Sequence, residues 1–100
     1  MSTAFVSTTP VFDPERPYQR SPSVALREES FGALVYHFGT RKLSFLKTRL
    51  LVDVVVGLES HDDVLSAMSA AGVPDAESPA YLRALAGLAS AGTIEPRETP

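Results

Sequence analysis

The chain has 100 residues, which fits one small domain. Hydrophobic residues make up 44% and charged residues 21%, as in an ordinary globular protein. The formal net charge of -3 argues against nucleic acid as a partner, because a duplex-binding protein normally carries a basic surface. Cysteine is absent, which excludes disulfides, thiolate metal sites and a cysteine nucleophile and suits a reducing cytoplasm.

Both ends are predicted to lie outside the packed domain. Residues 1–22 are rich in Ser, Thr and Pro, which favours a flexible, extended or disordered arm, although Phe5, Phe12 and Tyr18 leave partial ordering open. The first residues have no positive stretch before an apolar core, so we predict no secretion signal. We expect the domain at residues 23–95, a frayed tail at 96–100 and no association with a membrane.

Three strands are predicted in the first half of the domain. Residues 23–27 alternate with a period of two, residues 32–38 are rich in Val, Tyr and Phe, and residues 41–46 complete a hairpin. Glu28, Glu29 and Ser30 are expected to form a polar turn with solvated charges. Gly39 and Thr40 fit a two-residue loop of type II′.

This loop sets the pairing of the last two strands. It places Tyr36 opposite Leu43 and Leu34 opposite Phe45, and we expect these four side chains on the buried face of the sheet. His37, Lys42 and Ser44 are then expected on the opposite face.

A helix is predicted directly after the sheet, from an N-cap at Thr48 to Leu58. Its apolar residues recur at helical spacing, namely Leu50, Leu51, Val54, Val55 and Leu58. Because consecutive valines are poor helix formers, a strand over residues 50–56 remains an alternative.

Two more helices follow. Ser60 is predicted to open the second helix, with Asp63 in a capping-box-like position, and Gly72 to end it. Ser78, followed by a proline, is predicted to cap the third helix, which ends at Gly92 before a short extended piece. The order of elements predicts an α+β fold in which a three-stranded antiparallel sheet is followed by three helices, a winged helix-turn-helix-like architecture.

The sequence contains no catalytic constellation. His61 lies beside Asp62 and Asp63, but three adjacent residues at a helix start point in different directions, so a solvated cap is favoured over a metal site. His37 is expected to be structural or at the surface. No nucleotide-binding glycine pattern and no framed nucleophilic serine occur. We therefore predict no enzyme activity, no metal and no cofactor.

Two features remain as candidates for binding. The densest basic cluster is Arg41 and Lys42 with Lys47 and Arg49 close by; edge-strand charges often prevent aggregation, and they can also attract an acidic peptide. The third helix has small residues on one side, at Ala80, Ala84 and Gly87, which suit either close helix packing or a shallow groove.

The segment FGALVYHFGTRKLSFL, residues 31–46, carries a family resemblance. It closely resembles the mycofactocin biosynthesis peptide chaperones, and a weaker similarity to the pyrroloquinoline quinone peptide chaperones covers residues 20–95, mainly as topology. The resemblance implies a recognition element for ribosomally made peptides. Such a domain binds the leader of a precursor peptide and presents it to a radical SAM maturase in the cytoplasm.

The resemblance also implies where the leader binds. In this family type the leader adds a strand to the third strand of the sheet and lies against the third helix. The corresponding residues here are Arg41, Lys42, Leu43, Ser44, Phe45 and Leu46 in the strand and Ala80, Arg83, Ala84 and Gly87 in the helix. The main alternative is a winged-helix DNA-binding regulator, but its recognition helix would have Arg83 as its only basic side chain. A small enzyme is a second alternative.

Overall fold

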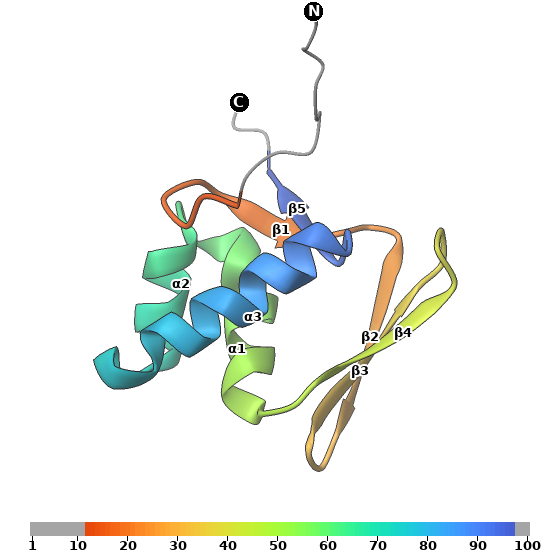
Figure 1. Ribbon diagram of the computed structural model, residues 1–100, viewed down its shortest axis with the longest axis horizontal. Helices are drawn as coiled ribbons and strands as arrows, with labels where there is room; N and C mark the ends of the chain where they lie inside the picture. Colours follow the sequence, from red (N-terminus) through yellow and green to blue (C-terminus); the bar gives the residue numbers. More distant parts are fainter. Residues whose placement is uncertain (1–11, 98–100) are drawn as a thin grey trace, which may run out of the picture.

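The computed structural model describes residues 12–97. Its strands and helices are, in chain order, β1 (Tyr18–Arg20), β2 (Val24–Glu29), β3 (Gly32–His37), β4 (Lys42–Leu46), α1 (Arg49–Gly57), η1 (Leu58–Ser60), α2 (Val64–Ala71), η2 (Asp75–Glu77), α3 (Ser78–Ser90) and β5 (Ile94–Pro96). The helices gather on one side of the sheet β2-β3-β4, as Figure 1 shows. The predicted α+β class, with antiparallel strands and three α-helices, is confirmed.

The strand count differs from the prediction because β1 and β5 form a second, two-stranded antiparallel sheet. β1 lies within the predicted arm, and Tyr18 in it is only 2% exposed and belongs to the hydrophobic core. Arg97, in the predicted tail, donates hydrogen bonds to the carbonyl oxygens of Tyr18, Leu58 and His61 at 3.1, 2.9 and 2.8 Å. The packed structure therefore extends beyond residues 23–95 at both ends; residues 1–11 and 98–100 lie outside the described part.

The hairpin of β3 and β4 has the predicted register. Tyr36 pairs with Leu43 and Leu34 pairs with Phe45. The predicted type II′ loop is wrong: residues 38–41 form a four-residue loop, Arg41 adopts the left-handed conformation at a φ of 63°, and its N–H donates to the His37 carbonyl at 2.7 Å. The His37 ring stabilises this loop, because its Nδ1 accepts the N–H groups of Gly39 and Thr40 at 3.0 and 3.2 Å.

The predicted buried face of the hairpin is the wrong one. Ala33, Val35 and Leu46 are at most 1% exposed and pack in the core, whereas Leu43 and Phe45 are more than half exposed. The buried residues of α1 are Leu51 and three valines, and they share the hydrophobic core with the smaller side chains Ala33 and Val35 of β3. Both faces of the hairpin are apolar, so alternation alone did not distinguish them.

The observed helices are closer to the predicted ones than the strands are. Thr48 caps α1, with its Oγ1 accepting the Leu51 N–H at 3.0 Å, so the alternative of a strand here is wrong. α2 begins later than predicted, because Asp63 is its N-cap and Ser60 ends the 3₁₀ turn η1. Ser78 is likewise the first residue of α3 rather than its N-cap. Leu85 anchors α3 in the core and is fully buried.

Candidate functional site

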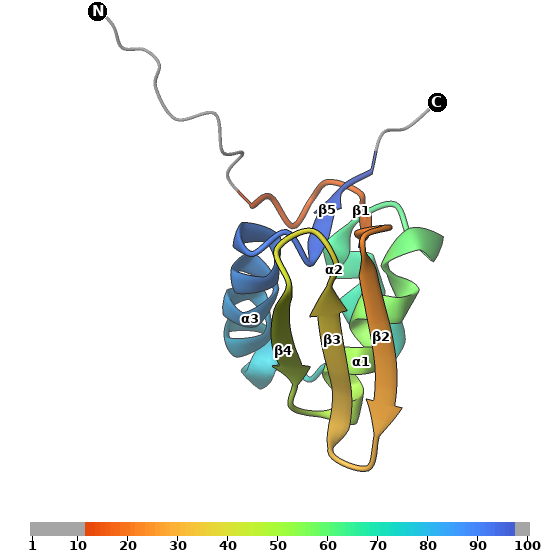
Figure 2. The same cartoon turned by 90° about the vertical axis from the view of Figure 1, so that its right-hand side faces the viewer.

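The outer edge of the sheet is formed by β4. The strand order is β2-β3-β4, and within residues 12–97 no strand pairs with the outer edge of β4. An edge strand presents backbone N–H and C=O groups to which another extended chain can pair. Figure 2 shows that α3 runs beside this edge, so the free side of β4 faces a helix.

A groove separates the end of β4 from α3. Its volume is about 350 Å³, and its walls come from the end of β4, the start of α1 and one side of α3. The lining residues are Phe45, Lys47, Thr48, Leu51, Ala80, Tyr81, Ala84 and Leu88. The Thr48 and Tyr81 hydroxyls lie 3.0 Å apart and connect the two sides. The small side chains of Ala80 and Ala84 keep the helix wall low.

The predicted binding residues are divided between this groove and its surroundings. Exposed among them are Arg41, Lys42, Leu43, Phe45, Ala80, Arg83, Ala84 and Gly87, while Ser44 is half-buried and Leu46 is buried in the core. Of these, Phe45, Ala80 and Ala84 line the groove, whereas Arg83 and Gly87 are exposed elsewhere on α3. A Cβ atom at Gly87 would meet nothing within 4 Å, so this glycine is not needed for helix packing.

Sequence reasoning missed the polar bridge of the groove. The sequence marks Thr48 only as a helix cap and assigns Tyr81 no part in the site. The sequence contains no local signal that brings them together, because they are 33 positions apart.

The predicted basic cluster is not one patch. Arg41 and Lys42 lie at the loop end of β4, whereas Lys47 and Arg49 follow its other end, about 16 Å away at the usual rise of a strand. Arg49 is also engaged, since its guanidinium donates to the Glu28 carboxylate at 3.2 Å and to the Glu29 carbonyl oxygen at 3.4 Å.

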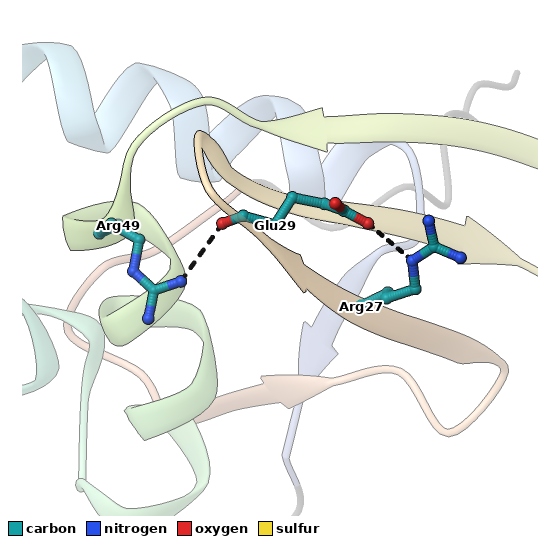
Figure 3. Close-up of polar contacts among 3 residues, drawn as sticks. All are labelled: Arg27, Glu29 and Arg49. Carbon is teal, nitrogen blue, oxygen red and sulfur yellow. Dashed lines mark hydrogen bonds and ion pairs between the residues drawn. The ribbon is translucent and has the colours of Figure 1, made fainter.

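The acidic residues beside Arg49 lie in β2 and not in the predicted turn. Figure 3 shows Glu29 between two arginines: its carboxylate accepts a hydrogen bond from Arg27 Nε at 2.6 Å, and its carbonyl oxygen faces Arg49. Solvent screens these exposed pairs, so they contribute little to stability.

Titratable groups elsewhere have structural roles. His61 Nδ1 lies 2.9 Å from the Gly57 carbonyl oxygen. Hydrogen bonds from Ser66 lower the pKa of Asp63 below its ordinary value. In the described part of the chain no three His, Cys, Asp or Glu residues gather to hold a metal ion, and none of the helices there is long and apolar enough to cross a membrane.

Comparisons with known proteins identify the family of the chain. The model of the peptide chaperone MftB family matches residues 17–95. The peptide chaperone MftB of Mycobacterium tuberculosis (strain ATCC 25618 / H37Rv) is 51% identical over 88 residues, which cover 88% of this chain and 81% of the relative. That of Mycobacterium ulcerans (strain Agy99) is 54% identical over 87% of this chain and 80% of the relative.

A third relative has the same name. The peptide chaperone MftB of Mycolicibacterium smegmatis (strain ATCC 700084 / mc(2)155) is 51% identical over 85% of this chain and 83% of its own length. No solved structure matches significantly. The predicted family and the predicted role as a peptide chaperone in mycofactocin biosynthesis are confirmed: the chain belongs to the peptide chaperone MftB family.

Proposed function

We propose that this peptide chaperone binds the leader of a ribosomally made precursor as an additional strand on β4 and presents it to a radical SAM maturase. The observation that carries the proposal is the free edge of β4 beside the groove of about 350 Å³. Strand addition supplies main-chain hydrogen bonds, and a groove for side chains supplies specificity. Holding the leader raises the effective concentration of the precursor at the maturase.

In this proposal the domain is a winged-helix-like adaptor in the cytoplasm and not an enzyme. The chemistry on the precursor belongs to the maturase, and the chaperone needs no metal or cofactor. The backbone of Lys42–Leu46 pairs with the leader, while Phe45, Ala80 and Ala84 contact its side chains. Arg83 and Gly87 flank the groove on α3, and Arg41 lies near the far end of the docked strand.

Hydrogen exchange of the full chain tests the strand addition. Backbone amides of β4 point alternately toward β3 and toward the free edge. We expect the edge-facing amides of Lys42–Leu46 to exchange more slowly when the precursor leader is added. Tight binding of the leader without slower exchange in β4 would contradict the proposal.

A pair of proline substitutions sharpens this test. Leu43 and Ser44 are neighbours, so one of their N–H groups faces β3 and the other faces the free edge. Proline removes an N–H donor and is tolerated at a sheet edge when that donor faces outward. One of Leu43→Pro and Ser44→Pro should therefore keep the fold and lose leader affinity, whereas the other should unfold the hairpin.

Substitutions on α3 test the groove. Ala84 lines it and Gly87 does not, although both are exposed on the same helix. We expect Ala84→Leu to lower leader affinity by about tenfold or more, because the larger side chain occupies the groove. Gly87→Leu is the matched control, which should keep the fold since open space surrounds this position. A greater loss of affinity in Gly87→Leu than in Ala84→Leu would contradict the groove as the binding site and indicate that the leader lies on the other side of α3.

A further inference from the structure

The sheet has a second exposed surface, on the side turned away from α1. Five large apolar residues are 37–58% exposed there, and we call them the open face: Phe31, Tyr36, Phe38, Leu43 and Phe45. The rings of Phe31 and Phe45 are 6.1 Å apart, and those of Tyr36 and Phe38 are 5.4 Å apart. The register adds Leu43 beside Tyr36, so the five residues form a continuous surface.

The open face is large enough to be a site of interaction. At about 200 Å² for a large side chain, with about half of it exposed, the five residues expose on the order of 500 Å². The largest apolar patch on a typical monomer is of about this size and is often functional. None of the residues between 12 and 97 covers it, and Figure 2 shows β2, β3 and β4 from this side with the helices behind them.

The proposed leader strand would extend this surface. A strand added to β4 places alternate side chains on the open side of the sheet, next to Leu43 and Phe45. The other side of that strand faces α3, which runs beside the free edge of β4 (Figure 2) and contributes Ala80 and Ala84 to the groove. A protein that takes the peptide from β4 therefore reaches it from the open face.

We propose that the open face is the docking surface for the maturase and that a bound leader strand completes it. This inference rests on the proposed function. The open face alone is smaller than the roughly 800 Å² per partner of a stable protein interface. Outward-facing leader side chains enlarge it, so the maturase binds the chaperone–leader complex more tightly than the chaperone alone. Two open faces packed against each other would also fall short of the area of a stable interface, which argues against a second copy of this chain as the occupant.

Substitutions far from the groove test the proposal. Tyr36 and Phe38 belong to the open face but lie neither in β4 nor in the groove. Threonine suits a sheet surface, so Tyr36→Thr with Phe38→Thr should preserve the fold. Phe38→Thr alone, in the loop, is a milder second variant. Val56→Thr is the matched control, because Val56 is 50% exposed on α1, behind the sheet.

Two affinities are measured by calorimetry with the full chain: that for the precursor leader, and that for the radical SAM maturase at saturating leader. We expect the double variant to keep leader affinity within about twofold and to lose maturase affinity by about tenfold or more, as for central aromatic residues of an interface. Phe38→Thr alone should lose part of the maturase affinity, and Val56→Thr should lose none of it. Wild-type affinity for the maturase should also rise when leader is present.

Other results overturn the inference without affecting the proposed function. Unchanged maturase affinity in the folded double variant means that the maturase docks elsewhere. A dimer in sedimentation that the double variant abolishes makes a second copy the occupant. If the double variant changes the amide signals of residues 1–11 and leaves maturase affinity unchanged, the chain's own first residues occupy the open face. The proposed function is tested separately: it is contradicted if the leader binds and the amides of β4 do not exchange more slowly.

Discussion

Replacing Gly32 with alanine tests whether the end of β4 lies where the structure places it. Gly32 has a φ of +153° at the start of β3, in a region that side chains rarely adopt. A Cβ atom there would lie 2.0 Å from the Leu46 carbonyl oxygen and 3.1 Å from the Thr48 backbone nitrogen. Both neighbours are backbone atoms, so β4 and the start of α1 have to move to admit a methyl group.

The cost follows from these contacts. An unfavourable backbone conformation costs on the order of 1–3 kcal/mol, and forcing extra atoms into a packed site costs about as much again. We therefore expect Gly32→Ala to lower the free energy of unfolding by about 2–6 kcal/mol, a large part of the total for a domain of this size. Because Thr48 lines the groove, leader affinity should fall as well.

Gly87→Ala is the matched control. It lies within α3, and an added Cβ would meet nothing within 4 Å. Alanine should raise the free energy of unfolding by about 0.5–1 kcal/mol. Urea titrations followed by circular dichroism measure both variants. If Gly32→Ala unfolds within about 0.5 kcal/mol of the parent, less than either term above, the close approach of β3 to the end of β4 is refuted.

Three further changes test other parts of the structure. Arg97→Ala removes the hydrogen bonds to three backbone carbonyls and should lower the free energy of unfolding by about 2–3 kcal/mol in the same titrations, and Arg97→Lys should restore only part. The lowered pKa of Asp63 means that its ionised cap stabilises the fold above the ordinary Asp pKa, and this stabilisation is lost as the pH falls below about 4. In thermal melts over this pH range, Asp63→Asn should therefore make the melting temperature depend less on pH. Arg41→Ala with Lys42→Ala should slow association with an acidic leader and weaken its salt dependence in stopped-flow measurements, whereas a change confined to dissociation would argue against steering.

Local signals in the sequence were sufficient for the pairing of the hairpin and for the cap of α1, but not for the caps of α2 and α3. The position of the turn at Gly39 and Thr40 predicted the register of β3 and β4 although its type was wrong, and Thr48 marked the start of α1. The buried face was predicted wrongly because the hairpin is apolar on both sides, and only the packing of α1 decides between them. The surplus of large side chains, more than one small core can bury, was the available sign of an exposed apolar surface.

Long-range contacts were beyond the reach of local patterns. β1 has three residues and pairs with a strand 76 positions away, as in Gln19 and Glu95, so neither strand has a partner nearby in the sequence. The candidate site shows the same limit. Its strand wall and the small residues of its helix wall were predicted, whereas the contact of Thr48 with Tyr81 depends on how α3 packs.

The pairing of β1 with β5 has a consequence for biosynthesis. Closing a loop that runs from Tyr18 to Pro96 costs more conformational entropy than closing either short hairpin of the larger sheet. We therefore expect β2, β3 and β4 to pair early in folding and the β1–β5 ladder to form late. A nascent chain cannot complete this ladder until Ile94–Pro96 has left the ribosomal exit tunnel. Until then Tyr18 lacks its native strand partner β5, and the incompletely folded domain exposes apolar surface that can aggregate.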